Sequence, residues 1–218
     1  MEDTCLACGE KYTNFDKILY KCPNCGLGKT IIPTSLDKGT YHRDNVYLSE
    51  KKQFENIFQK IVGKISKIKN KGNVLEIGSS TGLLLSLFPG SKWTVQGIEP
   101  SKQAFKISQG QGIPTINTTF KNAKLKENFF DVIVLNHVLE HLENPKITLN
   151  KIYKVLKKDG ILYLSVPNFN SLSAKIYKSN WGYILPKEHT WHFTPQSLSL
   201  LLQKNRLEIK EWSAVSGV

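Results

Sequence analysis

The sequence lacks any long apolar run, and acidic residues are scarce. No stretch approaches the roughly 20 apolar residues that a helix needs to cross a bilayer. Glu2 and Asp3 stand where a secretory leader would carry basic residues, which favours a cytoplasmic chain. Only 18 acidic residues face 30 basic ones, and the net charge of +12 would favour an anionic partner such as a phosphorylated metabolite, RNA or a membrane surface. The lysines are scattered rather than grouped, so we interpret them as a solvated surface.

Cysteine is absent from most of the chain. The four cysteines, Cys5, Cys8, Cys22 and Cys25, all lie near the N-terminus as two C-x2-C pairs. Such spacing is typical of a tetrahedral zinc site with thiolate ligands, and the metal would replace the hydrophobic interior that so short a segment cannot build. A disulfide pair and a thiol redox couple are the alternatives. Four protein ligands would leave no open position, so we predict a structural zinc ribbon.

A glycine turn between two strand-like segments carries most of the information about function. Residues 74–82 read VLEIGSSTG, in which a short apolar run of strand type is followed by a turn and then by an apolar helix over 83–88. Residues 95–98 read as a second buried strand, and Glu99 follows it. A carboxylate at that place can accept hydrogen bonds from the two hydroxyls of a ribose. The pattern predicts a site for a nucleotide-shaped cofactor.

The rest of the chain alternates between strand-like and helix-like segments. Helices are expected at 102–109, 144–156 and 196–205, and strands at 115–116, 132–135, 161–166 and 207–212. This alternation predicts an α/β fold with a doubly wound, mainly parallel, Rossmann-like sheet and helices on both faces. The small zinc ribbon precedes it.

Residues 44–71 read as a basic amphipathic helix whose apolar side chains recur at steps of three and four. We expect it to pack on the sheet edge and cap the cleft, with membrane or RNA contact as alternatives. The predicted domains are therefore a ribbon at 1–40, a linker and helix at 41–72, and a cofactor-binding domain at 73–218. A last strand missing from this domain is the alternative to a complete sheet.

Several of these motifs together resemble class I S-adenosylmethionine-dependent methyltransferases, over about residues 74–212. Glu76, Gly78 and Gly82 match the E-x-G-x-x-x-G loop of that family, and Glu99 matches its ribose-binding acid. The segment LKKDGILYLSVPN at 156–168 is similar to the family's late L-K-P-G-G motif, and FFDVIVLNHVLEHLENP at 129–145 is similar to its fourth-strand motif.

The resemblance implies S-adenosylmethionine as the cofactor and a set of residues that bind it. These residues are Glu76, Gly78, Ser79, Ser80, Gly82, Glu99, Pro100, Thr119, Phe120, Asn136 and His137. Asn136 and His137 would lie near the methionine end, and Thr119 and Phe120 near the adenine. Two positions depart from the family pattern: Thr119 replaces a frequent aspartate, and Ser80 replaces a frequent glycine.

His137, Glu140 and His141 form an H-x-x-E-H pattern that also occurs in zinc proteases. We interpret it as a coincidence, since the whole phrase is expected within the methyltransferase motif. In ubiquinone-type O-methyltransferases, which look similar here, this face can hold a divalent ion. A metal at Glu140 and His141 therefore stays open as an alternative.

Residues 180–195, NWGYILPKEHTWHFTP, are where we expect the methyl acceptor to bind. Trp181, Tyr183 and Trp191 could form an apolar wall, and His189 or His192 could take a proton from the acceptor. Both histidines are candidate catalytic residues. Methyl transfer from a sulfonium needs mainly alignment, so an acceptor that is already nucleophilic would need no base.

The sequence leaves the acceptor open. A sugar, nucleotide sugar, lipid or quinone-like metabolite is favoured, and RNA is the alternative, for which Lys11, Lys17, Lys21 and Lys29 would have to form a basic stripe. A serine hydrolase that uses Ser80 within G-x-S-x-G, with Asp131 as a partner, is a second alternative. An inactive cofactor-binding remnant is a third, and a homodimer could complete the sheet.

Overall fold

The computed structural model describes residues 4–31 and 50–214, which fall into two compact units. The first unit combines Met1–Leu36, His137–Tyr153 and Val166–Val218, and the second combines Asp37–Asn136 and Lys154–Ser165. The described residues 4–31 therefore share a unit with the C-terminal part of the chain. Each unit is described separately below.

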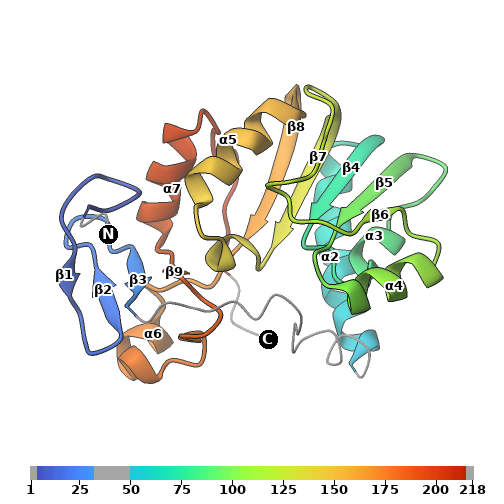
Figure 1. The fold of residues 1–218 in the computed structure, drawn as a ribbon. Helices are drawn as coiled ribbons and strands as arrows, with labels where there is room; N and C mark the ends of the chain where they lie inside the picture. The colour runs from blue at the N-terminus through green and yellow to red at the C-terminus, as the bar shows by residue number, and fades with distance from the viewer. Residues whose placement is uncertain (1–3, 32–49, 215–218) are drawn as a thin grey trace. The chain divides into compact units, whose positions relative to one another are not determined.

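The second unit is built on a five-stranded sheet in which every pair of neighbours is parallel. In spatial order its strands are β6 (Thr115–Ile116), β5 (Trp93–Ile98), β4 (Gly72–Ile77), β7 (Phe130–Asn136) and β8 (Leu156–Ser165). The crossover from β6 to β7 passes over β5 and β4, so the strand order reverses beside β4 (Figure 1). Ligands bind at such switch points in open α/β sheets. The predicted parallel, Rossmann-like sheet is confirmed.

The described residues of this unit form the helices α2 (Lys51–Ile68), α3 (Leu83–Ser86) and α4 (Lys102–Gly110). The predicted amphipathic stripe of α2 is buried, because Phe58, Ile61, Val62 and Ile65 pack into one core with side chains of α3 and of the central strands. Its lysines lie on the other faces and stay exposed. The helix is thus held by burial of its apolar face. Residues 44–49 of the predicted helix, and the predicted linker from residue 41 to 49, lie outside the described residues.

Asp131, at the start of β7, connects its own strand to the two strands beside it. Its carboxylate accepts hydrogen bonds from the Asn73 amide at 2.8 Å and from the Lys157 ammonium at 2.8 Å. Burial alone would raise the pKa of Asp131, but Lys157 and the Asn73 amide outweigh it and hold the pKa below its usual range. The carboxylate therefore links β4, β7 and β8 at the amino ends of the strands.

The first unit contains a four-stranded antiparallel sheet in the order β1 (Thr13–Asn14), β2 (Leu19–Lys21), β3 (Gly28–Thr30) and β9 (Trp191–His192). The last of these strands comes from the far end of the chain, and Figure 1 shows it beside β3. The unit also holds α6 (Leu172–Tyr177), α7 (Pro195–Lys204), the two short 3-10 helices η1 (Leu139–His141) and η2 (Lys178–Asn180), and the first part of α5 (Pro145–Val155).

The two compact units have other boundaries than the predicted domains at 1–40, 41–72 and 73–218, because β9 pairs with β3 of the N-terminal sheet. Sequence periodicity cannot reveal such a pairing, since the two partners lie more than a hundred residues apart.

One predicted element is wrong. The expected strand at 207–212 is irregular chain in the described structure, with Ile209 40% and Trp212 70% exposed. The alternation of apolar and polar residues suits a strand, but a strand also needs a neighbour to accept its hydrogen bonds.

In the described part of the chain, no helix combines the length and hydrophobicity that crossing a membrane requires.

We predict that Asp131→Asn lowers the free energy of unfolding at neutral pH by about 1 kcal/mol, because it removes the charge partner of the half-exposed Lys157. The folded pKa of Asp131 is depressed, so its contribution is present above the unfolded pKa of about 3.9 and disappears as the pH falls through the folded value. Urea unfolding at pH 7 and at about pH 3 measures this. Glu127→Gln, which removes an exposed carboxylate nearby in sequence, is the control. An equal effect of both substitutions, or a difference that does not shrink in acid, would contradict the assignment.

Candidate functional site

A cavity opens in the second unit at the carboxyl end of β4, where the glycine turn lies. Its lining comes from α2, from the turn, from the start of α3 and from the end of β7, and consists of Phe58, Glu76, Gly78, Ser79, Ser80, Thr81, Leu83, Leu84 and Asn136. Five of these residues belong to the predicted cofactor site: Glu76, Gly78, Ser79, Ser80 and Asn136. Phe58, Thr81, Leu83 and Leu84 were not predicted, although the apolar stripe of α2 gave the signal for Phe58.

The turn that follows β4 needs backbone conformations that glycine adopts at low cost. Gly78 has φ 71° and Gly82 has φ 80°, both in the left-handed region, and Ser80 adopts φ 45° between them. A methyl group on Gly82 would come within 2.7 Å of the Ser108 hydroxyl and 3.2 Å of Ile113. Gly82 is therefore required both by its torsion angle and by the space around it. A left-handed conformation at Ser80 stores strain of the kind that accumulates at binding sites.

Glu99, at the end of β5, holds this turn in place. Its side chain is 5% exposed, and its two oxygens accept backbone hydrogen bonds from Ser80 at 2.8 Å and from Ser101 at 2.7 Å. One carboxylate thus ties the turn after β4 to the turn after β5. Each carboxylate oxygen has a second lone pair, so Glu99 can also accept hydrogen bonds from two hydroxyls of a ligand.

Glu76 brings a second carboxyl group to the cavity wall. Burial and the negative charge of Glu99 raise the pKa of Glu76 well above its usual range. Its Oε2 atom and the Ser79 hydroxyl are buried and have no hydrogen-bond partner in the described part of the chain. Buried polar groups normally have partners, so these two atoms indicate a polar ligand. A cationic amino group in the cavity would supply a positive charge, which would stabilise the ionised form of Glu76.

The remaining predicted cofactor residues lie after neighbouring strands. Pro100 is exposed directly after Glu99, and Thr119 is exposed close after β6 while Phe120 beside it is buried. His137 follows β7 and begins the next part of the first unit, where its Nδ1 lies 3.4 Å from Glu140 Oε1. A cofactor with an amino acid at one end and a nucleoside at the other fits the donors and acceptors of the turn, because orphaned polar groups lie at Glu76 and Ser79 and a two-oxygen acceptor lies at Glu99.

The Ser80 and Asp131 pair of the alternative hydrolase hypothesis is not assembled. Ser80 lies after the carboxyl end of β4, whereas Asp131 lies at the start of β7, and strand pairing aligns Val74 with Val132. The two residues therefore lie at opposite ends of the same parallel sheet. Asp131 is already engaged by Lys157 and the Asn73 amide. The geometry of a nucleophile, base and orienting acid is absent for this pair.

The four cysteines converge in the first unit. Their sulfur atoms all lie within 4.8 Å of one another, with Cys5 and Cys25 3.4 Å apart and Cys8 and Cys22 3.3 Å apart. All four are free thiols, and burial raises the pKa of Cys22 and Cys25. Gly9 and Gly26 follow the pairs with φ 87° and 74°, which supports the predicted tight turns. This donor set fits a tetrahedral zinc ion, whose charge would ionise the thiols.

The segment with the two candidate catalytic histidines is attached to this cysteine-bearing sheet. The Thr30 hydroxyl donates to the His189 carbonyl, and the Thr194 hydroxyl donates to the Cys25 carbonyl at 2.7 Å. Because the Thr30 proton is used in this way, the 3.1 Å contact between His192 Nε2 and Thr30 Oγ1 makes Nε2 the donor. Burial lowers the pKa of His192 to about 3, so this ring is neutral.

Two of the three aromatic side chains expected to form an apolar wall, Trp181 and Tyr183, lie against each other. Trp181 is buried in a cluster with Leu19, Phe169, Ala174 and Ile184, and its ring lies 5.2 Å from that of Tyr183. Trp191 is also buried, and its indole nitrogen donates to the Leu142 carbonyl at 2.8 Å. His189 is 1% exposed and lies with Glu140 and His141 in a second cluster of metal-ligand type, which sequence spacing could not show.

Comparisons with known proteins point to one family. A family model described as a methyltransferase domain matches residues 49–211. The chain is 28% identical over 153 residues to a mitochondrial ubiquinone biosynthesis O-methyltransferase of Rattus norvegicus, covering 63% of this chain and 44% of that protein. It is 23% identical over 141 residues to the C-methyltransferase NovU of Streptomyces niveus, covering 62% and 33%. The chain thus spans less than half the length of these two relatives.

A solved structure shares the fold. The plantazolicin methyltransferase BpumL in complex with SAH matches with a TM-score of 0.59 and 20% identity, over 73% of this chain and 66% of that one.

We predict that Gly82→Ala lowers the free energy of unfolding by about 1–3 kcal/mol, because an alanine must adopt an unfavourable left-handed conformation and displace Ser108 or Ile113. Gly63→Ala is the matched control, since Gly63 lies exposed within α2 and has nothing within 4 Å of an added methyl group. That substitution should stabilise the chain by about 0.5–1 kcal/mol. Urea unfolding of both variants distinguishes the sites, and equal changes would mean that the turn is not constrained.

Proposed function

The chain belongs to the methyltransferase-domain family, and we propose that it is a class I S-adenosylmethionine-dependent methyltransferase that methylates a small-molecule acceptor. The single observation that carries the cofactor assignment is the glycine turn tied to Glu99, with the orphaned Glu76 carboxyl beside it. The Glu99 carboxylate offers two oxygens that can accept hydrogen bonds, and the buried Glu76 carboxyl would be stabilised by a cation. Both lie at the carboxyl ends of the strands, where parallel sheets bind ligands.

The protein's contribution to the reaction is orientation. When bound, S-adenosylmethionine would supply a methyl group on a positively charged sulfur. A nucleophile would attack the methyl carbon in line with the carbon–sulfur bond and displace the sulfur. Glu99 would hold the ribose hydroxyls, and Glu76 and Ser79 would hold the amino-acid end, so the reactive carbon would be fixed between two anchored ends. Such fixation can contribute several kcal/mol to a bimolecular barrier, roughly 7 to 11 in the best-oriented cases. Phe58, Leu83 and Leu84 would exclude water from the same cavity.

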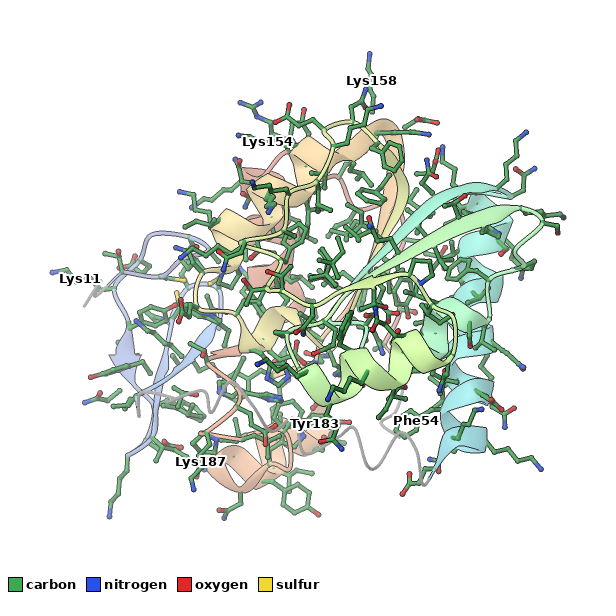
Figure 2. The ribbon with its side chains drawn as sticks, turned by 45° about the vertical axis from the view of Figure 1, so that its right-hand side comes forward. Lys11, Phe54, Lys154, Lys158, Tyr183 and Lys187 are labelled. Atoms are coloured by element: carbon green, nitrogen blue, oxygen red, sulfur yellow. The ribbon has the colours of Figure 1, made fainter. Side chains whose placement is uncertain are left out.

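A small metabolite is favoured over RNA as the acceptor. Two of the four ribbon lysines that would have to form a basic stripe are engaged with aromatic rings: Lys21 lies over Phe15 at 4.9 Å and Lys29 over Trp191 at 5.7 Å. Other lysines, such as Lys11 and Lys158, point outward singly (Figure 2). The relative named for ubiquinone biosynthesis supports a quinone-like acceptor. A sugar, nucleotide sugar or lipid belongs to the same proposal, and RNA stays the alternative. An inactive remnant and a homodimer remain predictions.

His189 and His192 remain our candidates for the residue that receives the acceptor's proton. The fixed donor role of His192 Nε2 leaves Nδ1 as its only basic atom. With so low a pKa, His192 would be a weak base, which suits an acceptor that ionises easily or one that needs orientation more than deprotonation.

We also propose that the four cysteines hold a structural Zn²⁺. A reducing compartment would keep such thiolates from pairing as disulfides, so a cytoplasmic location is part of the same proposal.

The assay that tests this function supplies S-adenosylmethionine with a labelled methyl group to the full chain, together with nucleotide sugars, quinone or lipid precursors, and bulk RNA. We expect label in a small-molecule fraction. His192→Asn should lower kcat while the affinity for S-adenosylhomocysteine is kept, because the affected group lies outside the cofactor cavity. Label in RNA alone would support the alternative acceptor. Cofactor binding without transfer to any acceptor would support the inactive remnant, and Glu143→Gln, at an exposed position, controls for nonspecific loss.

A further inference from the structure

A second cavity lies in the first unit, beside the second cysteine pair. Its volume is about 550 Å³, which falls within the roughly 300–1,000 Å³ that small-molecule sites span. The walls come from β1 and the turn after it, from the second cysteine pair, from the chain after β8 and from the start of α7. Every lining residue belongs to the first unit, and none of them lines the cofactor cavity. The cavity is therefore built from other residues than the site already described.

Three side-chain amides line this cavity and are not used elsewhere. Asn24, Asn170 and Gln196 are exposed, and their side chains make no hydrogen bond within residues 4–31 and 50–214. The hydrogen bond that Asn170 does make uses its backbone amide. Each carboxamide offers N–H donors and a carbonyl acceptor next to each other. A hydroxyl group is also both a donor and an acceptor, so the three amides suit a ligand that is rich in hydroxyl groups.

The wall that holds Gln196 is fixed before any ligand binds. The Thr194 hydroxyl donates to the Cys25 carbonyl at 2.7 Å and accepts from the Ser197 amide at 3.1 Å, which caps α7. The start of α7 is thus tied to the second cysteine pair, and Gln196 lies in the first turn of the helix. A wall that is already ordered lowers the entropic cost of binding.

Phe15 adds an apolar surface to the cavity, and Lys21 adds a positive charge. The Phe15 ring is exposed, and Lys21 Nζ lies 4.9 Å from its centroid. A methyl group on Gly26 would lie 3.9 Å from Lys21 Cε, so the lysine side chain runs beside the second cysteine pair. No acidic residue lines the cavity. Four thiolates outweigh the charge of one zinc ion, so Lys21 would be the counter-charge of the proposed metal cluster, which favours an uncharged ligand over an anion.

We propose that this cavity binds an uncharged carbohydrate. The sugar hydroxyls would pair with the amides of Asn24, Asn170 and Gln196, and an apolar C–H face of the ring would pack on Phe15. The inference concerns binding alone and does not require that the sugar be the methyl acceptor. It rests on the proposed structural zinc only for the choice between an uncharged ligand and an anion.

Binding is measured on the zinc-loaded full chain without S-adenosylmethionine, so a failure of methyl transfer cannot be mistaken for a failure of this proposal. The probes are glucose, galactose, rhamnose and N-acetylglucosamine, with glucose 1-phosphate as the charged counterpart. Saturation-transfer NMR should detect binding of at least one uncharged sugar, with an affinity that added salt leaves unchanged. Gln196→Ala and Asn170→Ala should each lower that affinity about two- to tenfold, because each removes hydrogen bonds to the sugar.

Gln203→Ala is the matched control, since Gln203 is exposed further along α7 and does not line the cavity. This variant should bind the sugar as the unsubstituted chain does, and an equal loss in it would overturn the proposal. Absence of saturation transfer to all four uncharged sugars would also overturn it. So would binding of glucose 1-phosphate alone, weakened by salt and lost in Lys21→Gln, because the cavity would then be an anion site.

A titration of the unsubstituted chain locates the ligand without relying on any variant. The side-chain amide signals of Asn24, Asn170 and Gln196 should shift in the NMR spectrum as the sugar is added. The signal of Asn136, which lines the cofactor cavity, should stay in place. A shift of Asn136 without shifts of the other three amides would place the sugar in the cofactor cavity and overturn the proposal.

Discussion

The hydrogen bonds from two backbone amides to the Glu99 carboxylate are the interaction on which the cofactor site depends. Ser80 and Ser101 belong to turns that follow different strands, and a single side chain joins them. The turn after β4 contains left-handed residues at Gly78, Ser80 and Gly82, which a free chain would seldom populate together. Charge-assisted hydrogen bonds to Glu99 offset part of that cost and fix the amide direction before any ligand arrives. The same carboxylate then faces the ligand already oriented, so less order has to be imposed on binding.

A comparable coupling operates in the first unit, where the cysteine-bearing strands extend into β9. A metal held by four thiolates would stabilise a sheet whose last strand carries Trp191 and His192. The ribbon therefore belongs to the same folding unit as the segment expected to meet the acceptor. Removal of its metal should disturb this unit, whereas the parallel sheet of the other unit has its own core of α2, α3 and strand residues. On the proposed function, stability and acceptor recognition would be linked in the first unit, and cofactor recognition would depend on the second.

The elements that the sequence predicted well are those determined by local pattern. The strand and turn at 74–82, the helix α4 and the cysteine pairs each carry their signal within a few residues, and the structure has them close to the predicted bounds. The failures are of a different kind. The segment 207–212 alternates like a strand but has no neighbouring strand in the described structure, and β9 is a strand only because β3 lies beside it. The joining of His189 to Glu140 and His141 was likewise invisible, since it depends on a loop returning to η1. Long-range partners decide these cases, and one sequence does not encode them in its periodicity.

The most direct measurement of the central claim is a thermodynamic cycle on cofactor binding. Calorimetry would compare S-adenosylhomocysteine with its 2′-deoxy analogue on the unsubstituted chain and on Glu99→Gln. If Glu99 holds the ribose, removing either the carboxylate charge or the hydroxyl weakens binding by about 1.5–3 kcal/mol, and removing both costs little more than removing one. Full additivity of the two losses, or no binding of S-adenosylhomocysteine to the folded chain, would contradict the account.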